Sequence, residues 1–334
     1  MKKIKQIIFM LRKFQRDIRS PRPRYAIPDE LRSQELGDYY FIFEEHRVAG
    51  GPDQPLISKL DENGIPVNKT YVDVINQDYV YFPISIGQLG LAVFHTWLKT
   101  GNENDKARFL KFAEWFADER HYDRSETLGI RWLTQVPLPQ YGNPGPWQSA
   151  FSQSRGISIL LRGYQLTGNP VWAEKARLAL TSFTQPVSEG GVTSFTPHGP
   201  FYEEYTAEVP TLVLNGMIFA LCGVYDYVRV FPEDPLPRKI FDDGIRTLEN
   251  ILPDYDLGYW SRYNLCRAEG YPDPDPATIG YQRLHVTQLD MLHRLTGNGL
   301  FRRYADIFNR QDTPANALKM YVKKAGALKK IGRL

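Results

Sequence analysis

The sequence contains few of the residues that build metal centres or disulfide frameworks. Only two cysteines, Cys222 and Cys266, occur in 334 residues, which excludes a disulfide scaffold and a cysteine-ligated metal site and predicts two reduced, inert thiols. The six histidines are scattered along the chain, so no zinc site is predicted. A phosphate-binding loop, a nucleophile elbow and a dinucleotide fingerprint are absent as well.

Long apolar runs are also missing. No segment approaches the roughly 18 apolar residues of a membrane-spanning helix. Near the N-terminus only residues 7–11 form an apolar run. That is shorter than the 7–15 residues of a signal-peptide core, and no small-residue cleavage site follows. We therefore expect a cytoplasmic protein.

The net charge of +3 conceals an uneven distribution. Residues 1–24 carry a net charge of +8 and residues 316–334 carry +6, so the remaining body carries −11. Basic ends suit an anionic surface, either lipid headgroups or a polyanion, and residues 3–18 have the pattern of an amphipathic helix lying on a membrane. Two solvated tails would have the same composition. The acidic body and the absence of a nucleic-acid motif argue against nucleic acid as a partner.

A Thr-Gly-Asn turn occurs three times, at residues 100–102, 167–169 and 296–298. Each turn separates two segments with helical apolar spacing, because glycine takes the left-handed conformation at a helix end and Asn begins the next helix. The turns are 67 and 129 residues apart, and 129 is close to twice 65. A fourth turn is expected near residue 231, so the period predicts four helical hairpins.

The hairpins predict a mainly α protein whose fold is an incomplete (α/α)4 toroid, with one helix of each pair facing a central cleft. The expected helices span residues 84–99, 103–119, 149–166, 170–184, 209–230, 236–251, 281–295 and 299–310. The toroid is assigned to residues 81–312. It is preceded by a basic segment, 1–24, and a small irregular or β region, 25–80, with short strands at 41–43 and 71–74, and it is followed by a basic tail, 313–334.

Long segments rich in Pro, Gly and Tyr join the hairpins, and loops of this length in a compact domain are usually functional. They hold two polar clusters, at residues 201–216 and 255–265, and a third begins a helix with Tyr281, His285 and Gln288 on one face. The aromatic content of 13% suits both a large helical core and a carbohydrate groove. Tyrosines packed under loops would explain any one cluster, but their repetition beside the hairpins favours a site.

A series of short motifs runs through the second half of the chain. They are Trp147 with Ser149-Ala150, Gln153, Ile157-Ser158, Leu161-Arg162 and Tyr164, Tyr202-Glu203-Glu204-Tyr205, Leu214-Asn215-Gly216, Gly223-Val224-Tyr225-Asp226, Leu252-Pro253-Asp254-Tyr255-Asp256 with Gly258, Tyr263, Leu265, Tyr281, His285 and Gln288-Leu289. In this order and spacing, residues 147 to 310 resemble the helical C-terminal domain of the glucuronyl C5-epimerases of heparan sulfate and heparosan biosynthesis. Upstream, residues 81–91 resemble a segment that this family places before a β-rich domain. Here the helical domain follows almost at once, so we expect no counterpart of that β-rich domain.

The resemblance implies four catalytic residues and conversion of D-glucuronate to L-iduronate. The Glu-Tyr pair of the family falls on Glu204 and Tyr205, and two further tyrosines fall on Tyr263 and Tyr281. Two positions depart from the family pattern. Thr206 stands where proline is usual, and residues 264–267 replace a segment that more often holds an acid and a basic pair.

This chemistry needs groups on both faces of the sugar. Removal of the C5 hydrogen of a uronate forms an enediolate-like dianion, which cationic and hydrogen-bonding groups must stabilise. Inversion then requires one group that takes the proton and another that returns it. Glu204 suits the base if burial raises its pKa from about 4.3, and Tyr281 suits the opposite face because a phenol with a pKa near 10 is a proton donor. Tyr205 and Tyr263 would polarise the carboxylate or tune this pair.

Further residues are expected to bind substrate. Arg162, Arg262, Asn215 and His285 suit the carboxylates of the polymer, although Arg162 suits a structural ion pair equally well. The motif residues Tyr81, Gln88, Trp147 and Gln153 complete the expected binding set. The expected partners are a glucuronate-containing acidic polysaccharide, an anionic membrane surface and a second copy of the chain; no cofactor or metal ligand set is expected.

Three other activities fit the same residues. A polysaccharide lyase would use the same C5 carbanion but expel the C4 oxygen, giving an unsaturated product that absorbs ultraviolet light. A non-catalytic glycan-binding toroid would bind without exchange at C5. A glycoside hydrolase would need two carboxylates about 5–9.5 Å apart, for which Glu203, Glu204 and Asp256 are available.

Overall fold

The computed structural model describes residues 15, 17–19, 23–51, 54–55, 57–70 and 78–330. Most of the basic segment 1–24, most of the expected amphipathic helix 3–18 and the expected strand 71–74 lie outside the described residues. Residues 41–43, the other expected strand, form only an isolated bridge between Ile42 and Ala26. The prediction of a strand at 41–43 is therefore wrong.

Four helical hairpins form the body of the protein, as the period predicts. They are α3 (Pro83–Thr100) with α4 (Glu103–Ala117), α5 (Ala150–Thr167) with α6 (Pro170–Ala179), α7 (Leu214–Val230) with α8 (Pro235–Ile251), and α9 (Ile279–Thr296) with α10 (Gly299–Gln311). Two boundaries differ from expectation. α7 begins five residues later than expected, after Pro210 and Leu212, whose φ of 50° is not helical. α6 ends at Ala179 and is followed by a 3-10 turn, η2 (Thr181–Thr184).

The remaining elements are short, apart from one helix. The strands are β1 (Gly50–Gly51), β2 (Gln54–Pro55), β3 (Lys59–Leu60), β4 (Pro66–Lys69), β5 (Tyr79–Val80), β6 (Asp123–Ser125), β7 (Gly129–Arg131), β8 (Thr193–Thr196) and β9 (Gly199–Tyr202), all paired antiparallel. The other helical segments are α2 (Glu45–Ala49), η1 (Pro139–Tyr141), η3 (Val187–Glu189), η4 (Leu252–Tyr255) and α11 (Pro314–Lys330). α11 occupies the region expected to be a basic tail, where Ala317 and Met320 are buried with Trp260.

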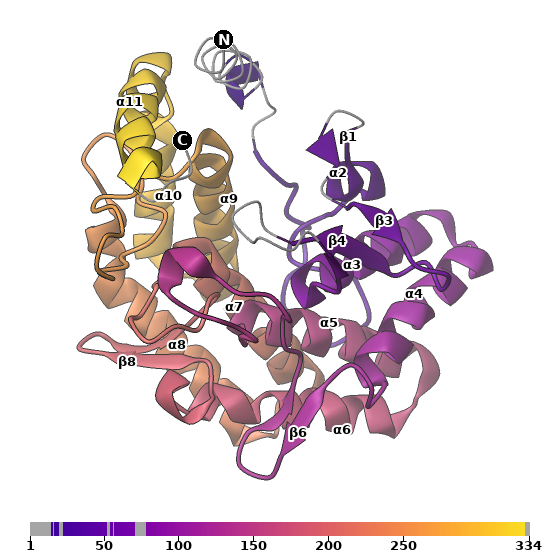
Figure 1. Cartoon of the computed structure of the whole chain (residues 1–334). Coiled ribbons are helices and arrows are strands. Elements are labelled where there is room, and N and C mark those ends of the chain that lie inside the picture. The colour runs from indigo at the N-terminus through magenta and orange to yellow at the C-terminus, as the bar shows by residue number, and fades with distance from the viewer. Residues whose placement is uncertain are drawn as a thin grey trace.

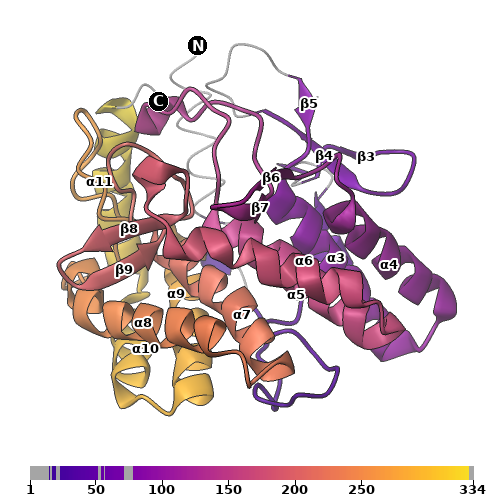
Figure 2. The ribbon, with the colours of Figure 1, turned by 90° about the horizontal axis from the view of Figure 1, so that it is seen from below.

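The hairpins follow one another around a curved row, from α3 and α4 to α9 and α10 (Figure 1, Figure 2). The first helix of each pair packs against the first helix of the next, in the order α3, α5, α7, α9, and the second helices lie outside them. The main packing contacts do not join α9 back to α3, so the ring is open. The architecture is the predicted α/α toroid. Among the described residues, no helix is both long enough and apolar enough to cross a membrane.

The Thr-Gly-Asn turns end the inner helices as expected. Gly101, Gly168 and Gly297 adopt left-handed conformations with φ of 65–75° at the ends of α3, α5 and α9. The following Asn side chains cap α4, α6 and α10, and Asp234 does the same for α8. Two side chains near the C-terminal ends of α5 and α7 bind the backbone of residues 33–35. Gln165 donates to Gln34 O, and Arg229 donates to Ser33 O and Glu35 O.

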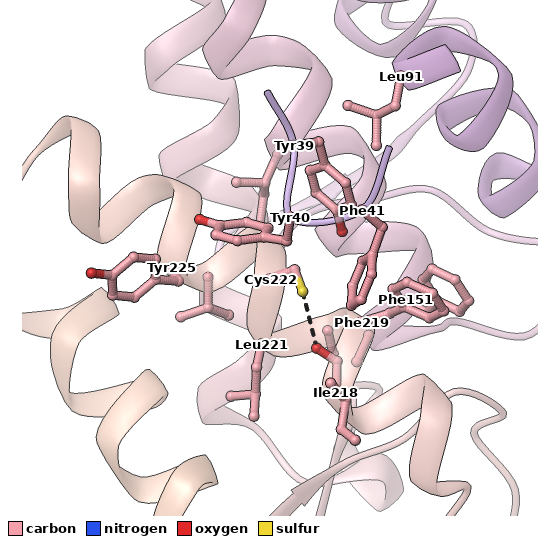
Figure 3. Close-up of a cluster of buried hydrophobic side chains, with 14 of the residues drawn as sticks. Tyr39, Tyr40, Phe41, Leu91, Phe151, Ile218, Phe219, Leu221, Cys222 and Tyr225 are labelled. Carbon is pink, nitrogen blue, oxygen red and sulfur yellow. Dashed lines mark hydrogen bonds between the residues drawn. The ribbon is translucent and has the colours of Figure 1, made fainter. Parts of the chain in front are cut away.

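Residues 39–43, which follow shortly after, fill the centre of the ring. Tyr39, Tyr40 and Phe41 lie between α3, α5 and α7, against Leu91, Phe151 and Phe219 (Figure 3). Both ring nitrogens of His95, in α3, lie 3.1 Å from the backbone nitrogens of Tyr39 and Phe43. Burial lowers the pKa of His95 to about 3, so this imidazole is neutral. Cys222 and Cys266 are both free and buried.

A buried carboxylate joins residues 39–43 to α5 and α7. Asp226 accepts from Arg162 at 2.6 Å, from Arg229 at 2.8 Å and from the Tyr40 hydroxyl at 3.2 Å. Burial opposes its ionisation, but the two guanidinium groups hold the pKa of Asp226 below its usual value. Because the Arg162 side chain is fully buried in this ion pair, it cannot bind substrate, and that expectation is corrected.

We expect Asp226→Asn to lower the free energy of unfolding by about 3–5 kcal/mol, because it leaves two buried arginines without their anion. The matched control is Asp290→Asn, which breaks a largely exposed pair with Arg302 and should cost less than about 1 kcal/mol. Urea unfolding followed by circular dichroism measures both. Equal losses would contradict the central role of Asp226.

Candidate active site

A cavity of about 650 Å³ opens where the inner helices begin. Every inner helix contributes to its wall from its first two turns, among other residues through Gln88 of α3, Phe151 of α5, Asn215 of α7 and Tyr281 of α9. The opposite wall includes Val48, Ile57, Asn68 and Lys69 from the N-terminal region. The cavity therefore lies at the rim opposite the Thr-Gly-Asn turns.

The position of the cavity favours a negatively charged ligand. The N-terminal end of a helix carries a partial positive charge, worth about 0.3–1 kcal/mol to a nearby anion. Four such ends face this cavity. At α7 the capping position is held by Val213, whose side chain cannot accept a hydrogen bond.

Glu204 provides a buried carboxylate at the cavity. It follows the β8–β9 hairpin and is only 4% exposed, although it lines the wall. Asn215 Nδ2 donates to its Oε2 at 3.3 Å. A Cβ at position 216 would lie 2.4 Å from Glu204 Cβ, so only glycine lets α7 approach this closely. Burial raises the pKa of Glu204 to about 7, although hydrogen bonds from Tyr205 and Asn215 oppose the shift.

Glu203, its neighbour, is buried away from the cavity. Its carboxylate accepts from Ser194 Oγ at 2.7 Å, from Thr211 Oγ1 at 2.7 Å and from Leu212 N at 2.9 Å. Burial also raises the pKa of Glu203 to about 7. These contacts hold the strained backbone of Leu212, whose carbonyl accepts from the Tyr255 hydroxyl at 2.6 Å. Glu203 thus positions the start of α7 and, through it, Asn215.

Three tyrosines surround Glu204. Tyr205 and Tyr281 line the cavity, and the ring of Tyr263 lies 4.9 Å from that of Tyr281. Burial raises the pKa of Tyr281 and the charge of Glu204 raises it further, while a hydrogen bond with Tyr263 lowers it. Burial likewise raises the pKa of Tyr263 well above its usual value. At neutral pH Tyr263 and Tyr281 are therefore protonated donors.

Trp147 and Tyr141 support Tyr205 from behind. Their ring centroids lie 5.3 Å and 5.4 Å from that of Tyr205. Trp147 does not line the cavity itself. It was expected to bind substrate, but the structure shows it packed against Tyr205.

Two cations at the cavity were missed by the sequence analysis as site residues. Arg24 and Lys69 both line the wall. Arg283 lies there too, but it is paired with Asp312 at 2.7 Å. Arg24 belongs to the basic run 1–24, which was interpreted as surface charge. The excess of cations in residues 1–24 is the feature of the sequence that could have indicated Arg24 as a site residue.

The structure places four other expected binding residues outside this cavity. Gln153 bonds to the backbone of Ile130 and Trp132, Arg262 pairs with Asp273 at 2.6 Å, and His285 lies 2.9 Å from Ser261 Oγ. Tyr81 donates to Asp61 at 2.8 Å and lines a separate cavity of about 580 Å³ beside Trp115 and His121. These side chains are committed to structural partners, so their expected roles in this cavity are corrected. The residues brought together are Glu204, Tyr205, Tyr263, Tyr281, Gln88 and Asn215.

The protein is thus an α/α toroid with a buried carboxylate and protonated phenols at one cavity. Residues 127–310, more than half of the chain, match the family model described as D-glucuronyl C5-epimerase C-terminus. The chain therefore belongs to this family. In the part of the chain that the structure describes, no three His, Cys, Asp or Glu side chains gather as a metal site.

Two curated relatives are similar in sequence. The chain is 29% identical over 174 residues to the D-glucuronyl C5-epimerase of Caenorhabditis elegans, covering 49% of this chain and 28% of that protein. It is 26% identical over 282 residues to an uncharacterized protein of Methanocaldococcus jannaschii, covering 79% of this chain and 88% of that one. The chain thus spans under a third of the nematode enzyme.

Two solved structures share the fold at low sequence identity. A sugar epimerase from a ruminal bacterium has a TM-score of 0.51 at 13% identity, covering 73% of this chain and 65% of that chain. A D-mannose isomerase has a TM-score of 0.50 at 10% identity, covering 75% of this chain and 64% of that chain. These likenesses show the fold alone.

We expect Glu204→Gln to flatten the dependence of stability on pH. A carboxyl whose pKa rises from 4.5 to about 7 on folding keeps its proton while the unfolded chain releases one. Stability is therefore fully present below about pH 4.5 and is lost as pH rises to about 7, by up to about 3 kcal/mol for this group. Glu203 contributes a similar decline, so the variant should keep about half of it.

Urea unfolding at pH 5 and pH 8 measures this effect. The control is Glu208→Gln, since Glu208 is exposed nearby and its replacement should leave the wild-type decline intact. If Glu204→Gln also retained the full decline, the carboxyl would not be buried as described.

Proposed function

We propose that the protein is a polysaccharide C5-epimerase that converts D-glucuronate to L-iduronate residues in a heparosan-like polymer. The observation that carries this proposal is the presence of a buried carboxyl with a pKa of about 7, Glu204, and a protonated phenol, Tyr281, in one cavity. Epimerisation at C5 needs a base on one face of the sugar and an acid on the other. Membership of the epimerase family and the activity named for the nematode relative support the same reaction.

In the proposed reaction Glu204 takes the C5 proton as the C5–H bond breaks. The electron pair moves into the carboxylate and forms an enediolate-like dianion. Tyr281 then returns a proton to C5 from the opposite face, and exchange with solvent restores a protonated Tyr281 and an ionised Glu204. A base with a pKa near the working pH combines a usable ionised fraction with adequate proton affinity.

The other residues of the cavity support these two. Asn215 donates to Glu204 and fixes the orientation of its carboxylate. The hydrogen bond from Tyr263 lowers the pKa of Tyr281, which stabilises the phenolate after proton transfer. Arg24, Lys69 and the four helix ends supply the positive potential that a dianion requires. They take the place of the basic pair that the family more often has after Tyr263.

We expect the purified protein to introduce deuterium at C5 of heparosan in heavy water and to form iduronate, both visible by NMR. An unsaturated product absorbing in the ultraviolet would instead identify a lyase. Binding of the polymer without exchange would identify a glycan-binding protein. Either outcome would overturn the proposed function.

We expect Glu204→Gln and Tyr281→Phe each to lower turnover by about 10²–10⁴-fold, the usual contribution of a general acid or base. Both changes preserve shape. The control is Tyr304→Phe in α10, whose ring packs on Phe308 away from the cavity and whose loss of a hydroxyl should leave turnover unchanged. Near-normal turnover in either site variant would remove that residue from the mechanism.

A further inference from the structure

Arg155 is a fully buried arginine with no exposed surface. It lies in the second turn of α5, and four aromatic rings surround its guanidinium group. The distances from its Cζ to the ring centroids are 5.1 Å to Tyr39, 5.2 Å to Phe43, 4.7 Å to Phe151 and 4.7 Å to Phe219. The rings stabilise the cation but do not neutralise it.

The hydrogen bonds of Arg155 do not neutralise it either. Nη1 donates to the Tyr39 hydroxyl at 2.6 Å and Nη2 donates to Gln88 Oε1 at 3.4 Å, while Nε has no partner. No carboxylate within the described residues pairs with Arg155. The other deeply buried arginines, by contrast, each have one: Arg162 and Arg229 share Asp226, and Arg283 has Asp312. Burying a cation without an anion costs free energy, so we expect the charge of Arg155 to have a function.

Arg155 lies directly behind the wall of the candidate active site. Phe151 and Phe219 stack on each other with centroids 4.6 Å apart (Figure 3). Both rings lie against Arg155, and both residues line the cavity. A Cβ at position 87 would lie 2.4 Å from Arg155 Cβ, so a glycine there brings α3 against α5. This close approach places Gln88 between Arg155 and the cavity.

The chemistry of the guanidinium group fixes the orientation of Gln88. Arginine has only donors, so the Gln88 amide must turn its oxygen toward Arg155. The NH₂ group of Gln88 is then left to face the cavity. There it can donate to an anion, and the charge of Arg155 behind it strengthens that bond.

We propose that Arg155 and Gln88 form a carboxylate-recognition unit that selects uronate over neutral sugars. Gln88 touches the substrate carboxylate, and Arg155 is a positioning residue that orients the amide and supplies positive potential as charge develops on the enediolate. The substrate carboxylate, bound to Gln88, would thus supply the negative charge that Arg155 lacks within the protein. This inference rests on the proposed function, because it takes a uronate as the ligand.

The test compares binding of a heparosan oligosaccharide with binding of its carboxyl-reduced, neutral counterpart by calorimetry. Wild type should prefer the acid form. Arg155→Met keeps the bulk but removes the charge, and Gln88→Glu gives Arg155 an internal carboxylate; each should reduce the preference by about tenfold or more. Arg155→Lys should restore part of it. In turnover assays Arg155→Met should raise KM for the uronate and also lower kcat, because the charge acts on both carboxylate and enediolate.

The control is Lys175→Met, which removes a cation stacked 4.8 Å from the Tyr122 ring, outside the cavity. It should keep the full preference. If circular dichroism showed that Arg155→Met does not fold, the test would rest on Gln88→Glu. If the folded variant kept the wild-type preference for the acid oligosaccharide, the role assigned to Arg155 and Gln88 would be overturned, but the proposed function would not. A wild type without any preference for the acid form would overturn the proposed uronate substrate together with it.

Discussion

The inner helices all run in the same direction, and the site depends on this constraint. Each inner helix ends in a turn of a few residues, and an outer helix then returns the chain to the starting rim. All four inner helices therefore begin at one rim. That geometry gathers Gln88, Phe151, Asn215 and Tyr281, which are far apart in the sequence, and points four positive helix ends at the same space.

Glu203 and Glu204 are adjacent in the sequence but differ in their hydrogen-bond partners. Glu203 and Glu204 are equally buried, and burial raises the pKa of each to about 7. Glu203 accepts three hydrogen bonds that hold a strained turn. Glu204 has fewer partners and faces a cavity, which is where the proposed proton transfer would take place.

The hairpin architecture could be predicted from the sequence because its signals are local. A Gly-Asn turn and apolar spacing depend on neighbouring residues, and all eight helices appear close to their predicted positions. The central residues 39–43 could not be predicted in this way, since a buried irregular segment and a strand share the same aromatic pattern. The ion-pair partner of a buried arginine could not be predicted either. Arg162 pairs with Asp226, 64 residues away, whereas Arg155 in the same helix pairs with no acid among the described residues. Glu204 and the tyrosines came from the family resemblance, whereas Arg24 and Lys69 required the fold.

The aromatic segment in the middle of the ring also bears on how the proposed glycan substrate would approach. Tyr39, Phe41 and Phe43 are almost completely buried and fill the centre of the ring, so the inner helices enclose packed side chains. On the proposed function, a polymer would therefore reach the cavity across the rim where the inner helices begin, and not along the axis of the ring. Such a polymer would have to bend one residue inward, so its local stiffness, rather than its length, would govern access.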